Sequence, residues 1–166
     1  MRPKLLATSA NRKPVSCYGD SHAARHFDDE PNLQSLVRRA IRMIHLRPDC
    51  SALTFDFRRV IGQTDLVQTG PEDQIVYARR SEREGYTRFA KDREQPDCTT
   101  VALVFRPPKH AGQGYLLTSA WIGPLTPPFP NKYRADQASL EFWANHALVW
   151  GSQAVIASTE TSNCPW

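Results

Sequence analysis

The stretch that decides the fold class is TTVALVF, residues 99–105, the most apolar of five stretches with the character of a β-strand. A strand this apolar favours a central place in its sheet, with neighbours on both sides. A Gly-Gln-Gly sequence at residues 112–114 follows it and predicts a turn into the next strand, over residues 115–122. We therefore expect the chain to be organised around a sheet with residues 99–105 near its middle.

Three further strands are predicted upstream of this stretch. Residues 53–58 alternate apolar and polar side chains, as a half-buried strand does. Residues 74–79 follow a turn signal at residues 70–73, and residues 86–91 alternate again. The connections have no room for crossover helices, so the five strands are expected to form one antiparallel meander.

An amphipathic helix is predicted before the first strand. It begins at Pro31, carries Arg38, Arg39 and Arg42 on its polar face, and ends at Pro48. Its apolar side chains are spaced three and four positions apart, which is the pattern of one buried helix face. These residues are Leu33, Leu36, Val37, Ala40, Ile41 and Ile44.

A second amphipathic helix is predicted after the proline-rich stretch at residues 124–130. Asp136 can cap its first turn, because an aspartate side chain accepts a hydrogen bond from a free backbone N–H there. An apolar stripe then follows at helical spacing. It consists of Leu140, Trp143, Ala147 and Trp150.

The predicted fold class is therefore α+β, with an N-terminal amphipathic helix, a five-stranded antiparallel meander and a C-terminal amphipathic helix. At 166 residues the chain is long enough for one sizeable core. We expect one domain over residues 31–150, preceded by an irregular arm at residues 1–30 and followed by a tail at residues 151–166.

Charge and cysteine content narrow the setting of the protein. The net charge is +4, and the surplus is confined to the stretch between Arg38 and Arg93, which permits an anionic partner such as RNA. No apolar run approaches the roughly 20 residues that cross a bilayer, and residues 1–16 lack the apolar stretch of a secretory signal. The four cysteines are scattered, so free thiols and a cytoplasmic location are expected, with no membrane partner.

No strong catalytic motif is present, but the stretch YARRSEREGYTRFAKDR, residues 77–93, combines six cations, three acids and three aromatic residues. Arginines offer planar donors for phosphate oxygens, and aromatic rings stack on unpaired bases. Arg79 and Arg88 would lie on sheet faces where they could converge with neighbouring strands. The alternative is a solvated hairpin in which glutamates pair with arginines across the strands.

The predicted last strand and the histidines supply the other candidate groups. Thr118, Ser119 and Trp121 combine hydroxyls with an indole near a strand end, or else belong to an amphipathic strand with the indole in the core. The imidazole of His45 is either a general acid or base, or a cation that is favourable at a helix C-terminus. His146 is either a proton-transfer group or a core histidine.

A metal site is not expected from the sequence. His22 and His26 are four residues apart and could share a helix face, but a zinc site needs a third or fourth ligand, and the sequence places none. We therefore expect no metal and no cofactor. A metal-dependent hydrolase using these two histidines stays open as a minor hypothesis.

In element order, residues 32–122 resemble the small metal-independent ribonucleases of the barnase/EndoU/colicin/RelE-like group. The resemblance implies attack of a ribose 2′-hydroxyl on the adjacent phosphorus, with a base, an acid and cations around the phosphate. It implies His45 or His146 as acid or base, and Tyr86 as a proton donor or stacking residue. It further implies that the phosphate is held by Arg80, Arg83, Arg88 and Lys91. The group that orients the scissile bond would be Thr118 or Ser119.

The sequence thus leads to two main hypotheses. The first is a metal-independent endoribonuclease, with Arg79 and Trp121 as further substrate contacts. The second is a non-catalytic domain that binds a protein or another ligand through the surface rich in Trp and Pro at residues 121–150.

Overall fold

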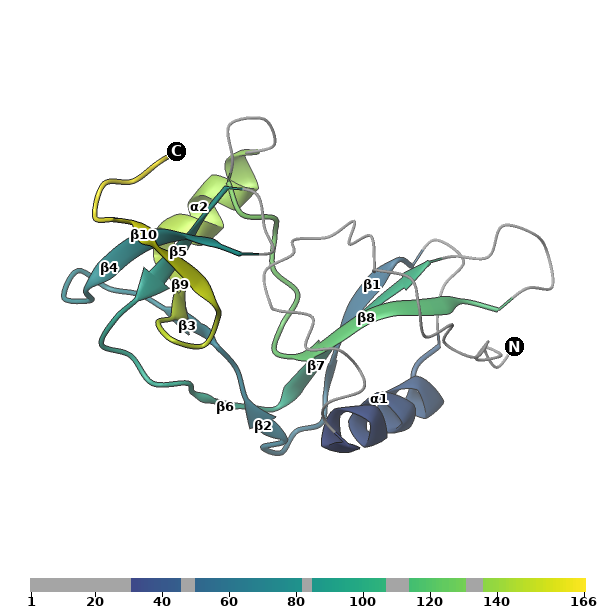
Figure 1. The fold of residues 1–166 in the computed structure, drawn as a ribbon. Coiled ribbons are helices and arrows are strands. Elements are labelled where there is room, and N and C mark those ends of the chain that lie inside the picture. The colour runs from purple at the N-terminus through teal and green to yellow at the C-terminus, as the bar shows by residue number, and fades with distance from the viewer. Residues whose placement is uncertain (1–30, 46–49, 82–84, 107–113, 131–135) are drawn as a thin grey trace. The chain divides into compact units, whose positions relative to one another are not determined.

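The computed structural model describes residues 31–45, 50–81, 85–106, 114–130 and 136–166. It is an α+β protein with two helices and mostly antiparallel strands (Figure 1). The described chain divides into two compact units. Unit 1 contains residues 31–45, 50–62, 98–106 and 114–125, and unit 2 contains residues 63–81, 85–97, 126–130 and 136–166.

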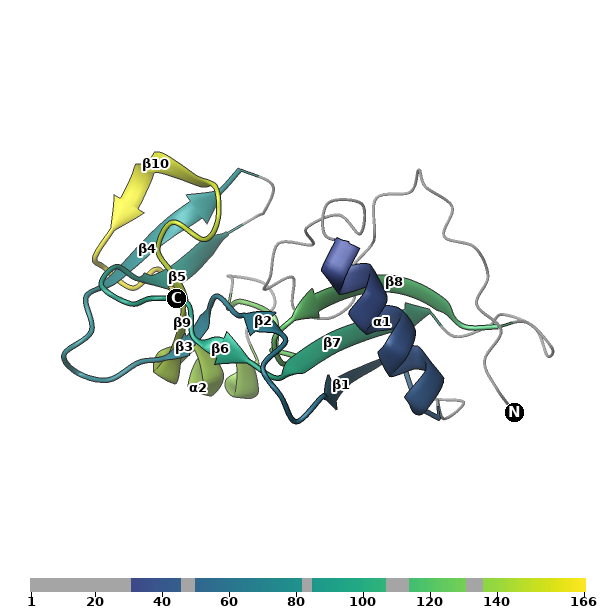
Figure 2. The ribbon, with the colours of Figure 1, turned by 90° about the horizontal axis from the view of Figure 1, so that it is seen from below.

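Unit 1 is a three-stranded antiparallel sheet with a helix on one face. The strands are β1 (Ala52–Asp56), β7 (Thr100–Arg106) and β8 (Leu116–Ile122), in the order β1-β7-β8. The helix α1 (Pro31–Met43) lies across β7 and β8 (Figure 2). The most apolar predicted strand is therefore the central one, as expected.

The core of unit 1 forms between α1 and the sheet. The apolar face predicted for α1 is buried, because its residues at spacings of three and four positions meet the same face of β7 and β8. Leu53 and Phe55 of β1 face the same core and pair in register with Leu103 and Val101 of β7. The buried residues are Leu33, Leu36, Val37, Ala40, Ile41, Ile61, Val101, Leu103, Phe105, Leu117 and Ala120.

Unit 2 is a five-stranded mixed sheet with a short helix. In space the strands follow the order β10 (Val155–Thr161), β4 (Ile75–Arg80), β5 (Tyr86–Ala90), β9 (His146–Val149) and β3 (Leu66–Gln68). All neighbours are antiparallel except β5 and β9, which run parallel. The remaining short strands, β2 (Gly62–Gln63) and β6 (Asp97–Cys98), pair in a sheet of their own.

The core of unit 2 forms between one sheet face and the helix α2 (Gln137–Asn145). Trp143 of α2 is fully buried against Phe89 and Leu148, and its indole Nε1 donates a hydrogen bond to the Pro128 carbonyl at 3.0 Å. The Asp136 carboxylate accepts from the Ser139 backbone N–H at 2.7 Å. The predicted cap of this helix is therefore confirmed.

The single five-stranded meander is not confirmed, because the five predicted strands lie in two sheets. The hairpins β4–β5 and β7–β8 form as expected. The place beside β5, however, is taken by β9 rather than by β7. Residues 146–149 had been expected to continue the second helix, but their backbone pairs with β3 and β5 instead. Tertiary pairing here overrides a helical pattern in the sequence.

Three further expectations concern the two ends of the chain and its cysteines. The predicted tail, residues 151–166, contains β10. The predicted arm, residues 1–30, lies outside the described residues. Cys50, Cys98 and Cys164 are free thiols, as expected. Within the described chain no helix is long and apolar enough to cross a membrane.

Candidate functional site

The described residues of unit 1 carry a strong local excess of positive charge. They include six arginines and one acidic residue, Asp56. All six arginines are exposed. Five of them lie on α1 and on the turn that follows β1, and we call these five the arginine surface. They are Arg38, Arg39, Arg42, Arg58 and Arg59.

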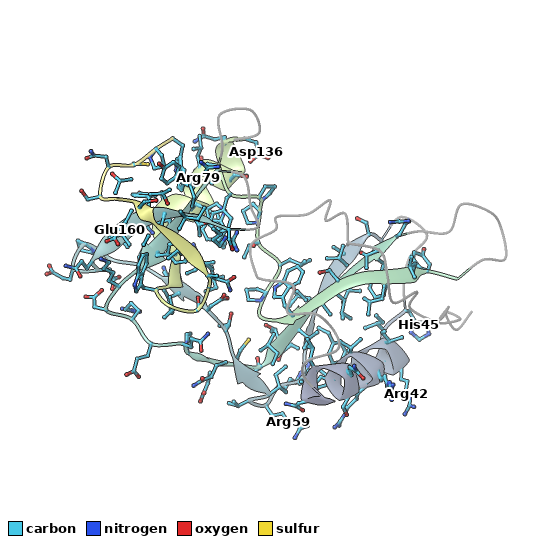
Figure 3. The ribbon with its side chains drawn as sticks, in the orientation of Figure 1. Arg42, His45, Arg59, Arg79, Asp136 and Glu160 are labelled. Carbon is cyan, nitrogen blue, oxygen red and sulfur yellow. The ribbon has the colours of Figure 1, made fainter. Side chains whose placement is uncertain are left out.

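The helix α1 positions three of these arginines. Because its apolar face is buried, Arg38, Arg39 and Arg42 lie on the side turned to solvent. His45 follows two residues after the end of α1 and is also exposed. Figure 3 shows Arg42 and His45 toward one end of α1, and Arg59 near the other end.

The turn after β1 brings Arg58 and Arg59 to the beginning of α1. The Asn32 side chain donates to the Ile61 carbonyl at 3.5 Å, which ties this turn to the first turn of the helix. Arg58 has a positive φ of 56°, and its backbone N–H donates to the Asp56 carboxylate at 2.7 Å. That bond, with a second one to the Thr99 side chain, lowers the pKa of Asp56. Asp56 therefore holds the turn that presents the two arginines.

The arginine surface is not neutralised by ion pairs among the described residues. The ion pairs among the described residues are Lys91–Glu160 and Arg93–Asp73, and both belong to unit 2. Exposed arginines that form no ion pair attract anions, and the planar guanidinium donates two parallel hydrogen bonds to phosphate oxygens. The arrangement is therefore suited to a ligand that carries several phosphates.

Unit 2 has the opposite charge balance. Its described residues contain nine acids and five arginines or lysines. Four of those five cations have partners inside the unit. Lys91 pairs with Glu160, and Arg93 pairs with Asp73 at 3.2 Å. Arg79 is exposed and lies opposite Tyr86 in the β4–β5 register.

Arg80 is buried beneath the aromatic residues of unit 2. Its Nε donates to the Thr87 hydroxyl at 3.0 Å, and its guanidinium lies 5.2 Å from the centre of the Phe129 ring. Burial lowers the pKa of Arg80 to about 10, although the negative charge of Asp65 acts in the opposite direction. A guanidinium held in this way organises the interior rather than a surface.

Arg88 is also held by the protein itself. One guanidinium nitrogen donates to the Thr69 hydroxyl and to the His146 carbonyl, both at 2.8 Å. Tyr77 lies opposite it in the β4–β5 register. Burial raises the pKa of the Tyr77 phenol, and the Arg88 charge opposes that rise. Both side chains are buried.

The imidazole of His146 lies on the α2 side of the sheet. It stacks on Phe142 with a separation of 4.0 Å between ring centres, and its Nδ1 lies 2.9 Å from the Phe142 carbonyl. Because a carbonyl oxygen can only accept, Nδ1 is the donor, which leaves Nε2 as the other ring nitrogen. The Arg88 contact uses the His146 backbone and not this ring.

The predicted site residues on β8, Thr118, Ser119 and Trp121, make their contacts within unit 1. The Thr118 hydroxyl donates to the Val104 carbonyl at 3.1 Å, and Ser119 is buried. Trp121 is buried with Ala102 and Val104, and its indole donates to the Pro124 carbonyl at 3.1 Å. The indole is therefore part of a core cluster.

The structure divides the predicted site residues between the units. Unit 1 holds His45, Thr118, Ser119 and Trp121, whereas unit 2 holds Arg79, Arg80, Tyr86, Arg88, Lys91 and His146. Arg83, His22 and His26 lie outside the described residues. Among the described residues no group of His, Cys, Asp and Glu side chains could hold a metal ion.

The sequence predicts Arg38, Arg39 and Arg42 on the polar face of a helix, but no local pattern singles out Arg58 or Arg59. The excess of positive charge is apparent only when the charges of each unit are summed separately. The tertiary structure defines the units, because segments on both sides of unit 2 residues in the sequence form unit 1. In the sequence as a whole, the acidic residues of unit 2 offset the positive charge of unit 1, so the net charge does not reveal it.

Comparison with known proteins adds no relative: no family model, no curated protein and no solved structure matches this chain.

Proposed function

We propose that this protein binds RNA through the arginine surface of unit 1 and cleaves it without a metal ion. The observation that supports this proposal is the set of five exposed arginines, beside which the described part of unit 1 contains one acid, Asp56, whose carboxylate holds the turn between β1 and Ile61. Binding of a nucleic acid backbone is driven largely by such cations, because they release the counterions of the phosphates.

His45 is the residue proposed for proton transfer. It is exposed, and it lies two residues beyond the end of α1, at the same end of the helix as Arg42 (Figure 3). In this reaction the imidazole takes the proton of the ribose 2′-hydroxyl, whose oxygen then bonds to the adjacent phosphorus. The bond from phosphorus to the 5′-oxygen breaks, and an acid protonates that oxygen. Arginines stabilise the negative charge on the phosphoryl oxygens.

The first experiment separates binding from cleavage. Purified protein is incubated with total RNA in EDTA, and the products are compared for the wild type, His45→Ala and His146→Ala. We expect cleavage by the wild type and by His146→Ala, and a loss of about 100-fold or more for His45→Ala. Cleavage that survives His45→Ala would remove His45 from the mechanism, and an inactive wild type would end the cleavage proposal.

The binding part is tested independently of turnover. A labelled RNA is titrated with the wild type and with Arg39→Ala/Arg42→Ala, and the control is Arg93→Ala, an exposed arginine of unit 2. We expect weaker binding for the double variant alone. Equal weakening by Arg93→Ala would point to net charge, and unchanged binding by the double variant would reject the arginine surface.

The alternative, a protein-binding surface at residues 121–150, has less support. Of the three tryptophans of this stretch, Trp121 and Trp143 are buried, and Trp150 is partly buried against the core of unit 2. The Trp143 indole donates to the carbonyls of Pro127 and Pro128 at 3.2 and 3.0 Å. Phe129 stacks on Trp143 with 3.8 Å between ring centres. Trp143 and Phe129 stabilise unit 2, and Trp121 belongs to a core cluster of unit 1, so these three rings offer little surface to a partner.

A further inference from the structure

We infer that the arginine surface recognises the phosphate backbone of a double-stranded part of the RNA rather than unpaired bases. This inference rests on the proposed RNA binding and adds the class of substrate. It follows from three properties of unit 1: the rigidity of the helix, the position of its aromatic rings, and the kinds of polar side chain on its surface.

The cations are mounted on a rigid and convex support. α1 has 13 residues, so it is about 20 Å long. Its buried face fixes its orientation on β7 and β8, and Arg38 and Arg42, four residues apart, are separated by a rise of about 6 Å. A duplex presents phosphates at a regular spacing, and a rigid row of guanidiniums suits it. A flexible single strand is typically held in a groove instead.

The aromatic rings in the described part of unit 1 are buried or only partly exposed, which limits stacking on bases. Proteins that bind single strands use exposed rings as platforms for successive bases. Among the described residues of unit 1 every aromatic side chain packs into one of the two core clusters or against it. Two pairs also contact each other edge to face, Phe55 with Phe57 and Phe105 with Tyr115. The aromatic residues are Phe55, Phe57, Phe105, Tyr115 and Trp121.

The polar chemistry of the surface also favours phosphates over bases. All the Lys and Arg side chains in the described part of unit 1 are arginines, the side chain that binds phosphate with two parallel hydrogen bonds. Asn32, which could read a base, donates to the Ile61 carbonyl. Contacts to the backbone position a protein on its ligand without reading sequence, and double-stranded RNA is recognised mostly by shape.

The test compares two oligonucleotides that cannot be cleaved. Short 2′-O-methyl RNA blocks the attacking hydroxyl, so wild-type protein can be used. One strand without self-complementarity is titrated alone, and the same strand is titrated after annealing to its complement, at one salt concentration and with fluorescence anisotropy. We expect the duplex to bind about tenfold more tightly or better.

The arginine variants then locate the contact. Arg39→Ala/Arg42→Ala is expected to weaken duplex binding by about tenfold or more, whereas Arg93→Ala leaves it unchanged. Circular dichroism of each variant shows whether the fold is retained, and the exposed position of all three side chains makes that the expected result.

The outcomes separate this inference from the proposed function. Equal or tighter binding of the single strand would overturn the inference and leave RNA binding intact. Binding of neither oligonucleotide would remove both. Duplex binding that is insensitive to the double variant would show that another part of the protein makes the contact, and would also overturn the inference.

Discussion

Arg88 shows how a residue with the chemistry of a site serves the fold. Its guanidinium nitrogen bonds to the Thr69 hydroxyl and to the His146 carbonyl, and its side chain is buried. Thr69 directly follows β3, and His146 is the first residue of β9. The Arg88 side chain on β5 therefore links this strand to both β3 and β9. Loss of activity in an Arg88 variant would therefore not identify a catalytic residue.

We predict that Arg88→Ala destabilises the protein by about 1–3 kcal/mol, because it leaves two partly buried hydrogen-bond acceptors without a donor. Urea unfolding followed by circular dichroism measures this change. Arg79→Ala is the control, since Arg79 is exposed on the same hairpin, and it should lie within about 0.5 kcal/mol of the wild type. Similar losses for both variants would contradict the internal role of Arg88.

Asp136 makes a prediction about pH. Hydrogen bonds from Ser139 lower the pKa of Asp136 below its ordinary value of 3.8. A carboxyl whose pKa is lower in the folded state binds fewer protons there than in the unfolded state. Its stabilising effect is therefore present above 3.8 and is lost as the pH falls through the folded value.

The variant Asp136→Asn keeps a side-chain acceptor at the helix cap but cannot titrate. We expect it to lose part of the acid-induced fall in the unfolding midpoint, whereas Asp136→Ala loses the cap at every pH. Thermal unfolding from neutral to acidic pH measures both effects. An Asn variant with the same pH profile as the wild type would show that this carboxyl does not contribute.

At the scale of elements, β9 is the piece that local patterns did not find. Its Leu148 is fully buried, and it pairs with Leu66 of β3 and with Phe89 of β5. The stretch around it also carries apolar residues at helical spacing, and the helix α2 ends at Asn145, immediately before it. As a strand, residues 146–149 form backbone hydrogen bonds with β3 on one side and with β5 on the other. If these residues continued the helix, the facing edges of β3 and β5 would lose these backbone partners.

We predict that Leu148→Ala costs about 2–5 kcal/mol, because it leaves a cavity between the sheet and α2. Leu140→Ala is the matched control, since Leu140 lies on α2 and is only partly buried. Denaturant unfolding compares the two losses. A cost for Leu148→Ala no greater than that for Leu140→Ala would show that β9 is not a core strand in solution.

On the scale of the whole molecule, the charges are sorted by unit. Unit 1 carries the arginine surface, and unit 2 carries more acids than cations among its described residues. A net charge of +4 spread evenly would attract a polyanion weakly, whereas a local excess creates a stronger field over one surface. Salt should therefore affect binding more strongly than the net charge suggests.

We predict that the logarithm of the RNA binding constant falls linearly with the logarithm of salt concentration, with a slope of about −3 to −5 if most of the five arginines contact phosphates. For the variant Arg39→Ala/Arg42→Ala we expect a slope that is less negative by about 1 to 2. Titrations at several salt concentrations give both values. A flat dependence would exclude a phosphate contact of this size.

The sequence by itself determined the helix α1, the hairpins β4–β5 and β7–β8, the central place of β7 and the cap of α2. The helix, the hairpins and the cap depend on contacts between residues close in the chain, where apolar spacing and capping chemistry act directly. The central place of β7 follows from its apolar composition, although its partner β1 is distant in sequence. The tertiary structure alone decided that the strands form two sheets and that residues 146–149 are a strand. It also decided which arginines are buried. Pairing of β9 with β5 and β3 joins residues far apart in sequence, and no local pattern records such a partner.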